Sequence, residues 1–156
     1  MQVHSAPVRG FTVIELLTVL AVSAVLLTAG VSSFVDQVAR RRLEGATIEL
    51  SSDLQYARSQ AVSNNTTVTL ATNAGGTQYS ITSPSATYKS VTLDSQLSFT
   101  PSLTITYDPL RAMATSSGVM TLSSSKTSAQ LRLSVTSVGR VSICSPSGGL
   151  TGYTPC

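Results

Sequence analysis

The sequence Gly10-Phe11-Thr12-Val13-Ile14-Glu15-Leu16-Leu17 opens an apolar stretch that decides the organisation of the chain. From Phe11 to Val35 this stretch has 25 residues and one charged side chain, Glu15. At 1.5 Å per residue, a helix of this length spans roughly 37 Å, enough to cross a hydrocarbon layer of about 30 Å. A carboxylate in hydrocarbon costs on the order of 2.5–3.5 kcal/mol. Glu15 therefore needs a positively charged partner, and a neighbouring helix of the same kind is the most economical source of one.

The residues around this stretch resemble the class III signal of type IV pilins. The matching features are a short leader that ends in Gly10, an aromatic residue at Phe11, the acid Glu15 and the leucine-rich helix that follows. The resemblance implies that a prepilin peptidase cleaves between Gly10 and Phe11 and that the new amine of Phe11 is N-methylated. It also implies that Glu15 neutralises the N-terminal amine of an adjacent subunit in the filament core.

The leader and the apolar stretch together predict a membrane topology. The basic residue Arg9 keeps the leader on the cytoplasmic side. We therefore expect a single-pass protein of the bacterial inner membrane, with its globular domain in the periplasm and later in a pilus filament at the cell surface. Two alternatives are a Sec signal peptide, cleaved near Thr28-Ala29-Gly30, and a plain single-pass anchor.

The helical pattern continues beyond Val35 to about Ser63, because no proline occurs between Pro7 and Pro84. Apolar residues recur at spacings of three and four and predict one buried helix face. This apolar stripe consists of Leu43, Ala46, Leu50, Leu54, Ala57 and Ala61. Asn64-Asn65 is expected to end the helix, since Asn tolerates left-handed backbone angles.

Two groups of charges on this helix suggest functions of their own. Arg40-Arg41-Arg42 has the composition of a lipid-binding or nucleic-acid-binding patch, although a solvated face just outside the membrane is the commoner meaning of such a run. Glu49 and Asp53 have the i, i+4 spacing of an acid–base pair. Because both lie off the apolar stripe with no evident cleft, we expect them to be solvated.

After Asn65 the periodicity changes from helical to alternating, which indicates short β-strands. The predicted strands are 66–70, 78–82, 88–93, 103–107, 119–122, 130–135 and 140–144. Tight turns between them indicate a mainly antiparallel sheet, which must cover the apolar stripe of the helix. The predicted fold class is α+β and type IV pilin-like, with a long N-terminal helix packed against a β domain. Its parts are a leader at 1–10, a transmembrane or filament-core half-helix at 11–35, an amphipathic half-helix at 36–64 and a β-rich domain at 65–156.

A second resemblance concerns the helix end and the last strands. Residues 53–62 with Asn64-Asn65, and Val138-Gly139-Arg140-Val141, are similar to the FimT/FimU minor pilins and to the H pseudopilin, GspH, of type II secretion. The resemblance implies a low-abundance subunit that primes a filament or occupies its tip, with other major and minor pilins as partners. In the FimT branch it also implies DNA binding during natural transformation, or competence, through a Gly-Arg-x-Arg element. Here Gly139 and Arg140 match that element, and Ser142 stands where it has a second arginine.

The distribution of charge bears on DNA binding independently. After Asp108 the side chains include four cations and no acid, so the last 48 residues carry +4 against the terminal carboxylate. A surface of one sign attracts phosphate without regard to sequence, although cations scattered over an ordinary soluble surface give the same count. The candidate contacts to double-stranded DNA are Arg111, Lys126, Arg132 and Arg140.

The remaining signals concern the cysteines and the lack of catalytic motifs. Cys144 and Cys156, the only two cysteines, are expected to form one disulfide in an extracytoplasmic domain. The surface around Arg140 and the loop closed by this disulfide are expected to make any ligand contact. The mature chain lacks histidine, a nucleophile elbow and a phosphate loop, so we expect no enzymatic activity, cofactor or metal. Three functions remain open: a structural tip or priming subunit, a DNA receptor, and a type II secretion pseudopilin.

Overall fold

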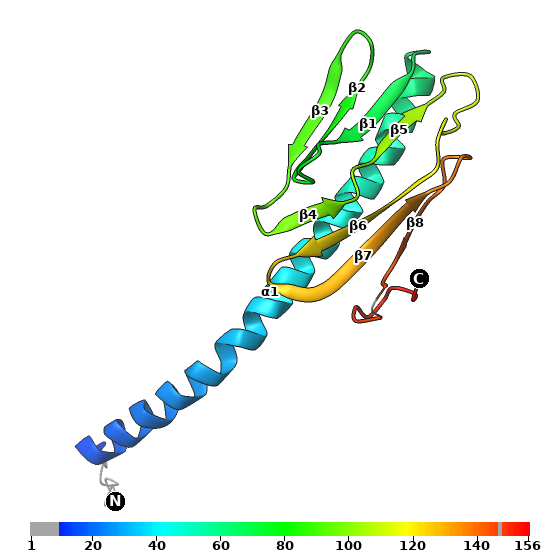
Figure 1. Cartoon of the computed structure of the whole chain (residues 1–156). Coiled ribbons are helices and arrows are strands. Elements are labelled where there is room, and N and C mark those ends of the chain that lie inside the picture. The colour runs from blue at the N-terminus through cyan, green and yellow to red at the C-terminus, as the bar shows by residue number, and fades with distance from the viewer. Residues whose placement is uncertain (1–9, 147) are drawn as a thin grey trace, which may run out of the picture. The chain divides into compact units, whose positions relative to one another are not determined.

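The computed structural model describes residues 10–146 and 148–156, without the side chains of residues 28–33. The predicted leader, 1–10, lies outside the described residues except for Gly10. The described chain forms one helix, α1 (Val13–Ser63), followed by eight strands (Figure 1). These strands are β1 (Val68–Thr72), β2 (Gln78–Thr82), β3 (Thr87–Thr92), β4 (Leu97–Thr100), β5 (Thr104–Tyr107), β6 (Gly118–Ser124), β7 (Thr127–Val135) and β8 (Val141–Cys144).

The chain divides into two compact units, Met1–Val35 and Asp36–Cys156. In the first unit, the large apolar side chains between Phe11 and Leu27 are exposed. Within the part of the chain that the structure describes, no helix combines the length and the apolar character needed to span a membrane.

Side chains and backbone groups close both ends of α1. At the start, the backbone N–H of Glu15 donates to Oγ1 of Thr12 at 3.3 Å, which is an N-cap hydrogen bond. At the end, the N–H of Thr66 donates to the carbonyl of Ala61 at 3.2 Å, and Asn65 adopts a left-handed φ of 47°. This pairing is a Schellman motif, which satisfies the last carbonyls of a helix. The prediction that the asparagine pair ends the helix is confirmed.

The strands of the second unit form two antiparallel sheets, in the orders β3-β2-β1-β5 and β4-β6-β7-β8. The sequence predicted seven strands in one layer and missed β4. This strand has four residues, of which Leu97 and Phe99 point into the core. Two apolar residues are too few to show a period of two, so the strand becomes evident only through its pairing with β6.

The core of the second unit lies between α1 and the inward faces of both sheets (Figure 1). The predicted apolar stripe is confirmed: Leu43, Leu50, Leu54, Ala57 and Ala61 are fully buried, and Ala46 is partly buried against the same cluster. The sheets contribute Leu70, Ile81, Ile105, Leu122, Leu131 and Leu133. Burying each such leucine or isoleucine contributes about 1.5–3 kcal/mol, so this contact holds the β domain on the helix.

Candidate functional site

The turn between β7 and β8 presents Arg140 to solvent. The N–H of Gly139 donates to the carbonyl of Thr136 at 2.8 Å, and the N–H of Thr136 donates to the carbonyl of Arg140 at 3.0 Å. Gly139 has a φ of +78°, so the hairpin is a tight turn followed by a residue in the left-handed region. Glycine adopts this angle without the clash that a side chain would cause.

A groove of about 720 Å³ lies between this turn and the C-terminal end of α1. A volume of this size is typical of small-ligand sites. Three elements line it: the last turns of the helix, the loop between β5 and β6, and the β7–β8 turn. The lining residues are Gln55, Arg58, Ser59, Val62, Ser63, Ala112, Val138, Gly139, Arg140 and Val141. We call this feature the Arg58–Arg140 groove.

Arg58 forms one wall of the groove and was not among the candidates chosen from the sequence. Its Nε donates to the backbone carbonyl of Ala112 at 2.7 Å. The ring of Tyr107 is buried beside the same turn, 3.4 Å from the position that a Cβ would occupy at Gly139, and its hydroxyl has no hydrogen-bond partner among the described residues. Burial raises the pKa of Tyr107, and the positive charge of Arg58 acts in the opposite direction. Sequence reasoning missed Arg58, because this residue lies next to the buried Ala57 on the helix and no nearby residue relates Arg58 to the β7–β8 turn.

The other predicted DNA contacts are spread over the domain. Arg111 precedes the groove residue Ala112 in the β5–β6 loop and is exposed. Arg132 is exposed on the outward face of β7. Lys126 lies in the turn before β7, whereas Arg140 follows the other end of that strand. Nine residues of strand span roughly 30 Å, so the structure does not bring Lys126 and Arg140 together.

Comparisons with known proteins place this domain in a family. Residues 46–139 match the family model described as type II transport protein GspH. The chain belongs to the GspH family. Residues 6–31 also match the prokaryotic N-terminal methylation motif. Together these matches identify a type IV minor pilin or pseudopilin.

Solved structures show the same fold as this GspH-family subunit. It is similar to the type IV minor pilin FimU of Pseudomonas aeruginosa in two crystal forms. The match to the first crystal form has a TM-score of 0.58 and 22% sequence identity, and it covers 72% of this chain and 95% of the FimU chain. The match to the second crystal form has a TM-score of 0.54 and 21% sequence identity, and it covers 70% of this chain and 98% of the FimU chain. The predicted α+β pilin fold is therefore confirmed. A comparison with curated protein sequences finds no match.

The C-terminal loop of this GspH-family subunit is closed by the predicted disulfide between Cys144 and Cys156. The loop packs on the helix through the buried Leu150, and Nη1 of Arg40 donates to the carbonyl of Gly149 at 2.5 Å. Arg40 precedes the groove residue Arg58 by roughly 27 Å of helix. The loop therefore contacts α1 near the start of the domain, whereas Arg140 lies beside the C-terminal end of α1.

Side chains of the run Arg40-Arg41-Arg42 form ion pairs within the domain. Arg40 pairs with Asp36 at 2.7 Å, and Arg42 pairs with Asp94 at 2.8 Å. Hydrogen bonds from Thr127 and then from Arg40 hold the pKa of Asp36 below its ordinary value. Two of the three arginines therefore attach loops of the domain to the helix, and the run is not a free basic patch.

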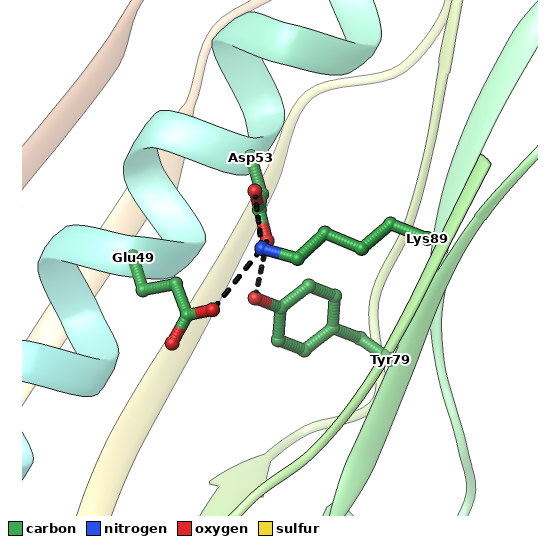
Figure 2. Close-up of polar contacts among 4 residues, drawn as sticks. All are labelled: Glu49, Asp53, Tyr79 and Lys89. Carbon is green, nitrogen blue, oxygen red and sulfur yellow. Dashed lines mark hydrogen bonds and ion pairs between the residues drawn. The ribbon is translucent and has the colours of Figure 1, made fainter.

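The expectation of solvated carboxylates is wrong for Asp53, which is 7% exposed. Figure 2 shows its carboxylate between Tyr79 of β2 and Lys89 of β3. The Tyr79 hydroxyl donates to Oδ2 at 2.5 Å, while Nζ of Lys89 lies 2.7 Å from the same oxygen and 3.1 Å from Oε1 of Glu49. Burial and then this hydrogen bond raise the pKa of Tyr79; the hydrogen bond with Asp53 raises that of Lys89. The ammonium between the two carboxylates indicates a structural ion pair.

Proposed function

We propose that this subunit is a minor type IV pilin that is cleaved after Gly10, anchored in the inner membrane and incorporated at the pilus tip or in the complex that primes it. The observation that carries the proposal is the exposure of every described side chain from Phe11 to Leu27. Phe11 is 87% and Leu27 69% exposed, and the apolar residues between them surround the helix. Such a surface needs lipid before assembly and the helices of other pilins afterwards.

The position of Glu15 suits it for contact with a neighbouring subunit. It lies in the first turn of α1, where the partial positive charge of the helix end favours a carboxylate. Its backbone N–H is bound by Thr12, and within the described residues its carboxylate has no hydrogen-bond partner. The carboxylate is therefore free for the methylated amine of an adjacent subunit.

Substitution of Glu15 tests this proposal. Glu15→Ala, and Glu15→Gln, which keeps the shape and removes the charge, should both remain in the membrane fraction and be depleted from sheared pili. Glu44→Gln, a loss of one carboxylate from the second unit, serves as the control and should be incorporated normally. Normal incorporation of both Glu15 variants would refute the pairing role.

The H-type pseudopilin of a type II secretion system is the alternative, because it needs the same N-terminal helix. Deletion of the gene separates the two. Loss of surface pili with normal protein secretion supports the minor pilin, and loss of secretion with normal pili supports the pseudopilin.

A second candidate function is contact with double-stranded DNA without sequence specificity, during natural transformation. The observation in its favour is the exposed Arg140 on a rigid turn, with the exposed Arg111 beside another groove residue. Titration of a short duplex at two salt concentrations should give saturable binding that weakens with salt and with Arg140→Gln. Absence of binding at low salt would leave a purely structural or priming subunit.

A further inference from the structure

Arg58 is the exception among the half-buried cations of the described chain. Arg40 pairs with Asp36, and Lys89 pairs with Glu49 and Asp53. Arg58 is likewise half-buried, yet within the described residues it has no acidic partner, and its one side-chain hydrogen bond is from Nε to a backbone carbonyl. A partly desolvated guanidinium without a counter-charge is costly, and an anion in contact with it would relieve that cost.

The second cation of the groove belongs to the β7–β8 turn. Nε of Arg58 lies 3.5 Å from the position that a Cβ would occupy at Gly139, and Arg140 follows directly. The side chain of Arg140 forms no ion pair or hydrogen bond within the described residues. Among the residues that the structure describes, no acidic residue lines the groove. The helix and the turn thus supply two unpaired guanidinium groups to one concave surface.

We propose that the Arg58–Arg140 groove binds one phosphate group between these two arginines. The proposal rests on the candidate DNA function and deepens it, since it names two arginines that would hold one backbone phosphate. The uncharged polar side chain of Gln55 lies in the same groove, and such side chains commonly accompany arginine at phosphate oxygens. A tetrahedral phosphate presents oxygens in several directions and can accept from arginines on both walls at once, whereas a carboxylate presents two oxygens in one plane.

The rest of the cationic surface is too dispersed to form a phosphate track. Lys126 lies at the far end of β7 from Arg140, and Arg132 is on the strand between them. Exposed apolar side chains, Val62 and Val138, border the groove. The geometry therefore favours one localised contact over a continuous basic stripe. Inorganic phosphate and the DNA backbone offer the same chemical group, so the experiment includes both.

The test uses the full chain in neutral detergent, because residues 11–27 expose apolar side chains. Three probes are titrated: inorganic phosphate, a short DNA duplex and a glutamate-rich peptide. The variants are Arg58→Gln, Arg140→Gln and Arg58→Lys. Arg58→Lys keeps the positive charge, so it serves as a second variant at this position in case loss of the hydrogen bond to Ala112 weakens the fold. Lys126→Gln is the matched control for Arg140→Gln, since each removes one exposed positive charge that has no acidic partner among the described residues. Thermal unfolding checks that each variant is folded.

One neutralised phosphate contributes a slope of about −0.9 to the log of DNA affinity against log salt, or roughly a 3.5-fold loss between 50 and 200 mM. Arg58→Gln and Arg140→Gln should each weaken the binding of phosphate and DNA, because each variant leaves the phosphate in contact with one arginine. Arg58→Lys should keep the slope, because its charge is unchanged. Lys126→Gln should match the wild-type protein in its binding of inorganic phosphate.

The outcomes separate this proposal from the DNA function. If DNA binding depends on Arg140 while Arg58→Gln equals Lys126→Gln, the two-arginine site is refuted and the DNA function stands. If phosphate binding needs both arginines and DNA does not bind, the site stands and the DNA function falls. If the glutamate-rich peptide binds and the other two probes do not, the groove prefers a carboxylate ligand, and the phosphate proposal is overturned. Absence of binding by all three probes would overturn both.

Discussion

Tyr79→Phe removes one hydroxyl group from the Asp53 ion pair and leaves the packing of the ring in place. The ring is 2% exposed and meets Phe99 edge-on, with 5.9 Å between centroids. A hydrogen bond to a charged group contributes about 1.5–3 kcal/mol to the free energy of unfolding. Because Asp53 keeps Lys89 at 2.7 Å, the carboxylate is not left unpaired, and we expect a loss of about 2 kcal/mol. For a domain of this size the melting temperature should fall by roughly 6–10 °C.

The assay is thermal unfolding of the full chain in neutral detergent, followed by circular dichroism. Tyr56→Phe is the matched control, since Tyr56 is 40% exposed and its hydroxyl has no partner among the described residues. The control should change the free energy of unfolding by less than about 0.5 kcal/mol. A double-mutant cycle with Asp53→Asn isolates the pair. Equal effects of Tyr79→Phe and Tyr56→Phe would refute the role of this hydrogen bond in holding β2 on the helix.

The pH dependence of stability gives an independent check. The pKa of Tyr79 is raised above its ordinary value of 10.0 and that of Lys89 above 10.5. Above about pH 10 the unfolded chain loses protons that the folded chain retains, so stability falls as pH rises. The contributions of Tyr79 and Lys89 to the free energy of unfolding are both fully present below pH 10. The difference between wild type and Tyr79→Phe should therefore shrink in alkaline solution, and a difference that grows there would contradict the assigned direction.

Three further predictions concern the turn, the disulfide and the leader. Gly139→Ala places a side chain at a φ of +78° and should destabilise the domain by about 1–2 kcal/mol. Gly139→Asn should be less harmful, and melting curves equal to that of the wild-type protein would contradict the backbone strain. Cys144→Ser with Cys156→Ser opens a loop of sequence separation 12 and should lower stability by roughly 3 kcal/mol, measured by denaturant titration against the oxidised protein; an unchanged midpoint would refute this. Gly10→Val should block leader removal, so that the protein is about one kilodalton heavier, at roughly 110 Da per residue, by mass spectrometry; unchanged processing would show that the cleavage assignment is wrong.

Local sequence determined the main elements of this GspH-family fold. The spacing of Leu43, Leu50 and Leu54 gives the buried face of the helix, because a period of 3.6 residues is a property of neighbouring positions. Asn65 ends the helix through its own backbone angle, and the alternation along β7 shows which side chains face inward. The cysteine pair was predictable because the chain has two cysteines and an N-terminal motif that predicts an extracytoplasmic domain.

The tertiary structure decided the division of the strands into two sheets, the burial of Asp53 and the pairing of Arg42 with Asp94. It also placed Arg58 beside Gly139 and kept Lys126 away from Arg140. Each of these facts depends on contacts between residues far apart in the sequence, and a period of two or 3.6 says nothing about which strand lies next to which. The charge of Arg58 is plain in the sequence. Its lack of a counter-charge is a consequence of how the helix end, the β5–β6 loop and the β7–β8 turn pack together.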